Sequence, residues 1–302
     1  MNDYERFTAM IANTNNGPPG LIQKKIDKFN MTLDTSDGGI SSVLYNTGFR
    51  EKAFMLLIRN TVKENDICVD LGSNIGYTTL FMLDNVGPSG HVYAIEPDQH
   101  NVDILKLNIK ENNFIDMCTI DQLAISDYDG KLDFWIASKP NLNSVKKTKH
   151  SIRKETVQCQ TLKTYLDDKK YPNFIKMDVE GHEVKIFEGA LDYFSENYGR
   201  TSFLVEVHPH FYDKDNDFSK ILKEYFKIGF NCSAVVSTPT PQPSLYKELG
   251  YAPKGVIQTD GFMRGLYTNI KNEDLVELAC KPHYESGSRK IARSFMLTRE
   301  TE

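Results

Sequence analysis

Two glycines follow an acid in the segment ICVDLGSNIGYTTLFM (67–82), which predicts a short buried strand, a turn and an apolar helix. The acid, Asp70, lies near the end of the strand, and Gly72 and Gly76 lie in the turn. Ligands of an open parallel sheet bind beyond the carboxyl ends of its strands. This turn is therefore the first place to look for a bound nucleotide.

The spacing of the two glycines argues against a pyrophosphate at this turn. The dinucleotide fingerprint is G-x-G-x-x-G, in which backbone amides close on a pyrophosphate. Here the gap between Gly72 and Gly76 is one residue too wide, and the carboxylate of Asp70 would repel an anion. A glycine also lets the backbone approach a ligand, because it has no Cβ. We therefore expect a nucleoside with a positive amino group and no phosphate here, and S-adenosylmethionine fits.

A second acid, Glu96, closes the next expected strand, HVYAIEP (91–97). A carboxylate at the tip of a neighbouring strand can accept hydrogen bonds from both hydroxyls of a ribose. Pro97 then turns the chain and leaves Asp98 near the expected adenine edge. Asp70 and Glu96 could each be an ordinary strand-end carboxylate. Their order around the wide glycine pair favours a nucleoside site.

Acids and imidazoles also follow the later strands. The run KMDVEGHE places Asp178 at the end of one strand, and LVEVHPH carries Glu206 and His208 on the next. Side chains two residues apart share a face of a strand, so Glu206 and His208 point the same way. If these strands are neighbours, the three side chains converge beside the methyl group of the cofactor.

This convergence fits methyl transfer to a hydroxyl, which is a displacement at carbon. The enzyme must hold the acceptor oxygen about 3 Å from the methyl carbon, and a base must remove the proton of the hydroxyl. His208 is the first candidate base, because its unperturbed pKa of ~6.5 suits neutral pH. His182 is the second candidate. A strand-end imidazole bonded to Glu206 is the structural alternative.

The same side chains also suit a divalent cation. Asp178, Glu206 and His208 offer the oxygen and imidazole ligands that magnesium or manganese accept. A metal would bind the acceptor oxygen and lower its pKa. The residues alone do not separate a base from a ligand set, and the hypothesis without a metal is favoured.

The elements that must position these residues alternate between strand and helix from residue 67 onward. Expected strands are 67–71, 91–97, 117–125, 131–137, 156–162, 174–179, 202–208, 231–236 and 262–268. Expected helices are 50–63, 101–113, 183–191 and 218–230, and residues 21–29 have a helix-like pattern. This alternation indicates a parallel sheet with helices on both faces.

Five segments resemble, in order, the FkbM family of S-adenosylmethionine-dependent methyltransferases. They lie roughly within residues 50–210 and read VDLGSNIGYTT, AIEPDQHNVDILKLNIKENN, LAISDYDGKLDF, LKTYLDD and FIKMDVEGHEVKIFEGA. The resemblance implies a Rossmann-like class I methyltransferase fold, whose mostly parallel seven-stranded sheet has helices on both faces and an antiparallel last strand. It also implies methyl transfer to oxygen, often to a hydroxyl of a sugar or secondary metabolite.

The resemblance also implies which residues contact the cofactor. A set in the glycine turn would cradle the methionine part, namely Asp70, Gly72, Asn74 and Gly76. Glu96 would take the ribose, and the residues flanking adenine would be Leu123 and Ala124. Glu51 matches an upstream acid that touches the cofactor, and Asp178 would lie at the methyl end.

Three regions are expected along the chain. Residues 1–64 form an N-terminal helical arm or lid, 65–270 the methyltransferase domain and 271–302 a C-terminal extension. The five cysteines contain no C-x-x-C pair, which fits a reducing, cytoplasmic location. No apolar run approaches the ~18 residues of a membrane span.

The acceptor is expected to be a small-molecule or carbohydrate hydroxyl. The net charge of −5 does not favour nucleic acid as a partner. A protein or RNA acceptor with the same cofactor is the alternative enzyme, and a non-catalytic cofactor-binding subunit is the alternative of another class. The glycine spacing disfavours a dehydrogenase. The oligomeric state is not indicated.

Overall fold

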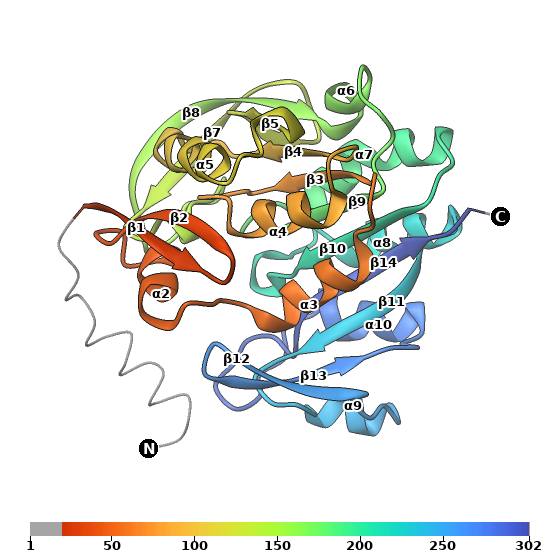
Figure 1. The fold of residues 1–302 in the computed structure, drawn as a ribbon. Helices are drawn as coiled ribbons and strands as arrows, with labels where there is room; N and C mark the ends of the chain where they lie inside the picture. Colours follow the sequence, from red (N-terminus) through yellow and green to blue (C-terminus); the bar gives the residue numbers. More distant parts are fainter. Residues whose placement is uncertain (1–19, 302) are drawn as a thin grey trace.

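A nine-stranded sheet forms the centre of the computed structural model, which describes residues 20–301 (Figure 1). Its strand order is β12-β13-β11-β14-β10-β9-β3-β4-β5. Five neighbouring strands run parallel: β3 (Ile67–Leu71), β4 (His91–Ile95), β5 (Cys118–Asp121), β9 (Phe174–Met177) and β10 (Thr201–Glu206). The strands beyond β10 pair antiparallel: β14 (Ala292–Arg299), β11 (Asn231–Ser237), β13 (Phe262–Tyr267) and β12 (Gly255–Thr259).

Helices cover both faces of this sheet, as predicted. The helices on one face are α3 (Lys52–Thr61), α4 (Tyr77–Val86) and α5 (Gln99–Glu111). The helices on the other are α6 (Leu162–Leu166), α7 (Glu183–Glu196), α8 (Phe218–Lys227) and α10 (Asn272–Cys280). Successive strand residues point to opposite faces, so Cys68 joins one core and Val69 the other. Strands this apolar are typical of a sheet buried on both faces.

The helix expected at 21–29 is wrong, because these residues enter a β-hairpin of β1 (Leu21–Ile26) and β2 (Phe29–Asp34). Exposure alternates along β1, with Ile22, Lys24 and Ile26 turned inward, so a period of two prevails over the helical period. Asp27 makes the tight turn at φ 53°. The hairpin and α2 (Ile40–Thr47) make the start of the expected helical arm partly β; residues 1–19 of that arm lie outside the described residues.

The expected strand 117–125 divides into two. Its first part is β5, and its last residues form β6 (Ala124–Ser126) in a separate three-stranded sheet with β7 (Gly130–Ala137) and β8 (Ser151–Thr161). The chain turns between them where the amide of Leu123 donates to the carbonyl of Asp121. Single turns of 3₁₀ helix complete this region and the loop after β10: η1 (Ile115–Met117), η2 (Pro140–Leu142) and η3 (Pro209–Phe211).

The C-terminal segment lies inside the sheet. Strand β14 pairs antiparallel with both β10 and β11, although residues 271–302 were expected to form an extension. The antiparallel last strand is thus present, and the sheet is mixed and has nine strands because the β12–β13 hairpin is added at its edge. A short helix, α9 (Ser244–Glu248), precedes that hairpin and buries Tyr246.

Candidate active site

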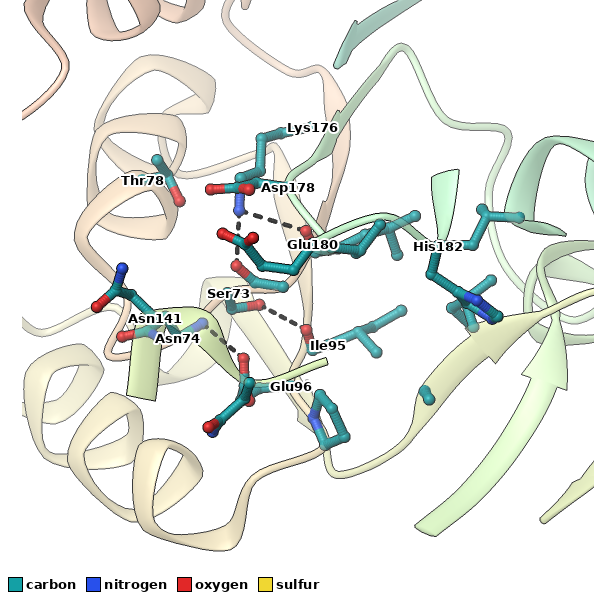
Figure 2. Close-up of a pocket in the computed structure, with 18 of the residues that line it drawn as sticks. Ser73, Asn74, Thr78, Ile95, Glu96, Asn141, Lys176, Asp178, Glu180 and His182 are labelled. Atoms are coloured by element: carbon teal, nitrogen blue, oxygen red, sulfur yellow. Dashed lines mark hydrogen bonds between the residues drawn. The ribbon is translucent and has the colours of Figure 1, made fainter. Parts of the chain in front are cut away.

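A cavity of about 970 Å³ opens at the carboxyl ends of β3, β4 and β9 (Figure 2). Nine of the predicted site residues line it: Glu51, Gly72, Asn74, Glu96, Pro97, Leu123, Ala124, Asp178 and His182. Five others lie outside its lining: Asp70, Gly76, Asp98, Glu206 and His208. The structure therefore brings the predicted cofactor residues largely together and divides the predicted catalytic residues.

The glycines of the turn are required by protein neighbours. Gly72 and Gly76 have φ of 75° and 89°, which favour glycine. A Cβ on Gly72 would lie 2.2 Å from the carbonyl oxygen of Asp178, and one on Gly76 would lie 2.5 Å from Cδ1 of Leu105. The predicted reason for them, close approach of the backbone to a ligand, is therefore incomplete, since both glycines also let the turn pack on β9 and α5.

The carboxylate of Asp70 is buried, with hydrogen bonds to one oxygen and an ion pair at the other. It accepts hydrogen bonds from the hydroxyls of Thr78 (2.8 Å) and Thr79 (2.7 Å). The ammonium of Lys176 lies 2.9 Å from its other oxygen and donates to the carbonyl of Gly72 at 2.6 Å. Asp70 and Lys176 are paired across β3 and β9. The predicted repulsion of a phosphate by Asp70 is thus weakened, because an ammonium neutralises this carboxylate.

Lys176 is a site residue that the motif reasoning missed. It lines the cavity next to Thr78 and Asp178 (Figure 2). The signal was a lysine in the otherwise apolar run FIKM, where a buried charge needs a partner. Arg50, beside the predicted Glu51, also lines the cavity.

Glu96 lies where the ribose acid was expected. Its carboxylate accepts from the amide of Asn74 at 2.9 Å and from the amide of Asp98 at 3.0 Å. Burial raises the pKa of Glu96 to about 7. Asp98, expected near adenine, lies outside the cavity lining and caps α5. Its carboxylate accepts hydrogen bonds from the backbone amide of His100 at 2.9 Å and from the side-chain amide of Asn143 at 2.6 Å.

The apolar part of the lining lies beside Leu123 and Ala124, where Ile125 and Phe134 join it. His182 borders this part, and its Nε2 lies 3.0 Å from the hydroxyl of Ser126 in β6. Burial lowers the pKa of His182 to about 4. The imidazole is therefore neutral at neutral pH and is a weak base.

Asp178 marks the acidic part of the cavity. Within residues 20–301, its Oδ1 is buried and has no hydrogen-bond partner. Burial and the nearby Glu206 raise the pKa of Asp178 to about 7. Glu180 lines the cavity as well, and burial raises its pKa. A carboxylate that titrates near neutral pH in a cavity has the property expected of a general base.

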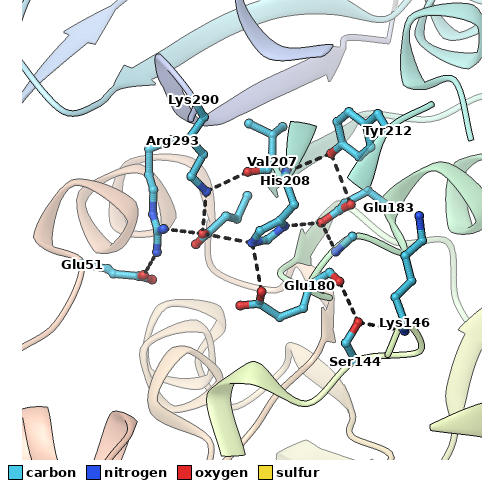
Figure 3. A network of polar contacts seen from close by, with 12 residues as sticks. Glu51, Ser144, Lys146, Glu180, Glu183, Val207, His208, Tyr212, Lys290 and Arg293 are labelled. Carbon is cyan, nitrogen blue, oxygen red and sulfur yellow. Dashed lines mark hydrogen bonds and ion pairs between the residues drawn. The ribbon is translucent and has the colours of Figure 1, made fainter. Parts of the chain in front are cut away.

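His208 lies behind this acidic part among carboxylates (Figure 3). Its Nδ1 is 2.6 Å from Glu183, and its Nε2 is 3.3 Å from Glu206 and 3.5 Å from Glu180. Burial alone would lower the pKa of His208, but Glu180 and Glu183 outweigh it and raise the pKa to about 10. The ring is an imidazolium at neutral pH, so neither of its nitrogens can accept a proton. The geometry therefore does not support the predicted role of His208 as the base.

Glu206 is held as an anion by two cations, one from β14 and one from the loop before it. Lys290 Nζ lies 3.1 Å from its Oε1, and Arg293 Nη1 lies 2.5 Å from the same oxygen. Burial would raise the pKa of Glu206, but Arg293 and Lys290 lower it well below the usual value. Arg293 also pairs with Glu51. Glu206 thus serves as an anchor for cations.

Two overlapping groups could hold a metal ion. The ligand atoms of Asp178, Glu180 and His208 lie within 4.8 Å of one another, and so do those of Glu51, Asp178 and Glu206. The predicted set of Asp178, Glu206 and His208 is therefore split between two groups that share Asp178. Protonated His208 and the cations around Glu206 already balance much of this negative charge.

The strand order, with an antiparallel strand between the last two crossover strands, is that of the class I methyltransferases. The family model described as the Methyltransferase FkbM domain matches residues 70–232, and the chain belongs to this family.

Several solved structures are similar. An FkbM methyltransferase from Methylobacillus flagellatus is 17% identical with a TM-score of 0.41; the match covers 68% of this chain and only 43% of that one. An O-methyltransferase from Bacillus cereus, in complex with SAH, is 11% identical over 83% of this chain and 80% of that one, with a TM-score of 0.40. TYW2 from M. jannaschii, in complex with AdoMet, is 13% identical over 94% and 88%, with a TM-score of 0.42. No curated protein matches.

The described residues contain no helix with the length and apolar character needed to cross a membrane.

Proposed function

We propose that this protein is an S-adenosylmethionine-dependent O-methyltransferase that acts on a hydroxyl of a small molecule or glycan. The observation that carries the proposal is that one cavity contains two acidic side chains in different surroundings. Glu96 lies beside the glycine turn, where a ribose diol would donate to it, and Asp178 lies beside Lys176 with one oxygen that has no hydrogen-bond partner in residues 20–301. The family match supports methyl transfer, and the acids argue for an acceptor that loses a proton.

The lining suits each part of S-adenosylmethionine. The apolar side chains of Leu123, Ile125 and Phe134 would flank the adenine, and Glu96 would accept from the ribose. Arg50, which also lines the cavity, would supply positive charge for the carboxylate of the methionine part. When bound, the cofactor supplies an electrophilic methyl group, and the protein need only orient the acceptor and remove its proton.

Asp178 is the proposed base, in place of a histidine. Its pKa near 7 means that about half of the molecules carry the carboxylate at neutral pH. Its Oδ1 has no hydrogen-bond partner in residues 20–301 that would compete for an acceptor hydroxyl. His208 would act as a positioning residue, because its imidazolium holds Glu180 and Glu183 in place.

A metal-assisted route is the second version of the same function, and its ligands would come from one of the two groups that share Asp178. A metal would lower the pKa of the acceptor hydroxyl. Turnover that survives EDTA would remove this version. Turnover lost in EDTA and restored by magnesium or manganese would instead assign Asp178 as a ligand.

The test is labelling of an acceptor. The protein is incubated with methyl-labelled S-adenosylmethionine and fractionated cell extract, and the labelled product is characterised by mass spectrometry. The proposal expects a methyl ether, which resists the mild alkali that hydrolyses a methyl ester. Label on protein or RNA would refute the acceptor class. Failure to bind S-adenosylmethionine in calorimetry would refute the cofactor.

A further inference from the structure

Two polar side chains that line the large cavity contain a buried atom without a hydrogen-bond partner. Within residues 20–301, these atoms are Oδ1 of Asp178 and Oδ1 of Asn141. Buried polar atoms in folded proteins are nearly always paired, and a buried acceptor without a donor is destabilising. An unpaired amide in the wall of a binding cavity therefore indicates a partner on the ligand. Asp178 is explained by its proposed role as the base, whereas Asn141 has no role in the proposed chemistry.

Other polar side chains of this wall are paired with protein groups. Thr78 donates to the carboxylate of Asp70, and Ser73 donates to the carbonyl of the same residue, both at 2.8 Å. The ring of His182 lies 3.0 Å from the hydroxyl of Ser126. In the described part of the chain, the wall thus pairs its buried side-chain atoms at all but two positions, and an unpaired amide is an exception.

Asn143 shows how the same loop treats a structural amide. Its Oδ1 accepts from the backbone amide of Ala137 at 2.8 Å, and its Nδ2 donates to Asp98 at 2.6 Å. Both ends of this amide hold the loop between β7 and β8 in place. Asn141 lies two residues earlier, in η2, and its Oδ1 has no donor among residues 20–301. Anchoring of the loop therefore does not explain it.

The start of α2 makes room for the side chain of Asn141. Gly39 is the N-cap of α2, and a Cβ added to it would lie 2.4 Å from Oδ1 of Asn141. The next residue, Ile40, lines the cavity too. Figure 2 shows Asn141 on the side of the cavity away from His182, which borders the apolar part. The last torsion of an asparagine side chain is broad and roughly twofold, so either end of the amide can turn toward a ligand.

The chemistry of an amide indicates the group that it would bind. An amide both donates and accepts hydrogen bonds, and so does a hydroxyl. We propose that Asn141 binds a second hydroxyl of the methyl acceptor, in addition to the hydroxyl that Asp178 deprotonates. The acceptor is then a polyol, such as a sugar, and a compound with a single hydroxyl is a poor substrate. This inference rests on the proposed function, which it deepens by naming the class of acceptor.

The ribose of the cofactor is the other source of hydroxyl groups. Glu96 already lies beside the glycine turn, where the proposed function places the ribose. The contact between Asn141 and Gly39 joins a loop to a segment that precedes residues 70–232, the part matched by the family model. Loops vary more among relatives than the elements they connect, and they often carry binding residues. This placement favours the acceptor over the cofactor.

The first experiment compares binding and turnover in Asn141→Leu, which keeps the approximate size of the side chain and removes its hydrogen-bonding groups. Initial rates are measured with methyl-labelled S-adenosylmethionine and dilutions of the extract fraction that takes the label. The KM for that fraction should rise about three- to tenfold, as for the loss of one hydrogen bond, and kcat should change less. The Kd for S-adenosylhomocysteine in calorimetry should stay within about twofold.

Two results of this experiment would overturn the proposal. An unchanged KM would show that Asn141 does not contact the acceptor. A rise of about tenfold in the Kd for S-adenosylhomocysteine would assign Asn141 to the ribose of the cofactor. Gly39→Ala serves if Asn141→Leu does not fold, because its Cβ would displace the amide. This variant should raise the KM in the same way.

The second experiment tests whether the fold needs Asn141. Without ligand, Asn141→Leu should leave the melting temperature unchanged or raise it, because it removes an unpaired buried polar group. Asn143→Leu is the matched control and should lower the melting temperature, because it leaves the amide of Ala137 and the carboxylate of Asp98 without this partner. A decrease in Asn141→Leu as large as that in Asn143→Leu would show a structural role and overturn the proposal.

The labelled product tests the class of acceptor. Mass spectrometry should find at least one free hydroxyl in addition to the new methyl ether. A product without a second hydroxyl would overturn the inference and leave the proposed function standing. A wild-type protein that labels no fraction would refute the proposed function and, with it, the inference that rests on it.

Discussion

Asp70 and Asp178 lie near the ends of neighbouring parallel strands, yet their surroundings differ sharply. Asp70 is enclosed by Lys176 and two threonine hydroxyls and does not line the cavity. Asp178 lines the cavity, and within residues 20–301 its Oδ1 has neither a hydrogen-bond partner nor a cation at ion-pair distance, whereas the Oδ1 of Asp70 lies 2.9 Å from Lys176. The first acid is therefore built to hold the glycine turn on β9, and the second is built to react or to bind.

The difference teaches that position in a motif does not decide the role of an acid. Asp70 occupies the place of the motif acid, but its partner Lys176 comes from a strand far along the chain. A free charge next to a ligand and a paired charge beneath a turn have the same local sequence. Only the partners of a carboxylate separate the two.

The largest expected effect is on turnover in Asp178→Asn. The amide cannot accept a proton from the acceptor, so kcat should fall by about 10²–10⁴-fold, as for loss of a general base. Affinity for S-adenosylmethionine should stay within about threefold. Single-turnover methyl transfer and calorimetry measure the two quantities, and Glu180→Gln is the control at the same end of the cavity. A greater loss in Glu180→Gln would move the base to Glu180.

The stability of the same variant should depend on pH. The pKa of Asp178 is raised from 3.8 to about 7 in the folded chain, so the folded state binds more protons between these values. The Asp178 contribution to stability is favourable below about pH 4 and is lost as pH rises through 7. Asp178→Asn should therefore unfold at higher urea than the wild type at pH 8. A lower urea midpoint at that pH would show that Asp178 has an unrecognised partner.

The next effect is on stability in Asp70→Asn. Removing one partner of a buried ion pair leaves the other charged, which typically costs 3–5 kcal/mol. The free energy of unfolding in urea should fall by about 3 kcal/mol, because the amide still accepts from Thr78 or Thr79. Adding Lys176→Met should recover part of this loss. An unchanged unfolding free energy with a large loss of cofactor affinity would restore Asp70 as a ligand-binding acid.

Much of the parallel core could be predicted from sequence, because β3, β4, β9 and β10 are apolar runs and each is followed along the chain by a helix. The hairpin β1–β2 could not, since its short apolar runs fit both periods and only packing on α5 decides. Thr32 and Asn108 exchange backbone and amide hydrogen bonds there at 2.6 and 3.2 Å. The place of β14 depends on pairing with β10 and β11, which no local pattern records.

The site shows the same limit. The place of Glu96, Leu123 and Ala124 in the cavity lining could be predicted, because residues at strand ends lie at fixed places relative to the glycine turn. His208 could not be judged, because Glu183 and Glu180, which keep it protonated, surround it only in the folded chain. The sequence identifies which groups can titrate, and the fold decides whether their pKa values are raised or lowered.

A smaller effect is expected for Glu96, the proposed ribose acid. Glu96→Gln keeps the size of the side chain but loses the charged acceptor, and a hydrogen bond to a charged group contributes about 1.5–3 kcal/mol. The Kd for S-adenosylhomocysteine should rise at least tenfold. Because burial raises the pKa of Glu96 to about 7, wild-type affinity should weaken as pH falls below 7, and the variant should lose this dependence. The Kd is measured by calorimetry from pH 5.5 to 8. If Glu96 had no such role, the Kd would depend on pH in the same way in the wild type and in Glu96→Gln.

The smallest effect is expected for His182, the second histidine proposed as a base. Its pKa of about 4 leaves the ring neutral throughout pH 5–8, so the ring does not titrate in that range and is a weak base. His182→Asn should keep a bond to Ser126, change the Kd for the cofactor by about two- to fivefold and leave kcat and its pH profile unchanged. A hundredfold loss of kcat, together with loss of the change near pH 7 in the pH–rate profile, would assign the role of base to this imidazole and not to Asp178. The comparison of a structural Asp70 with a reactive Asp178 would then no longer hold.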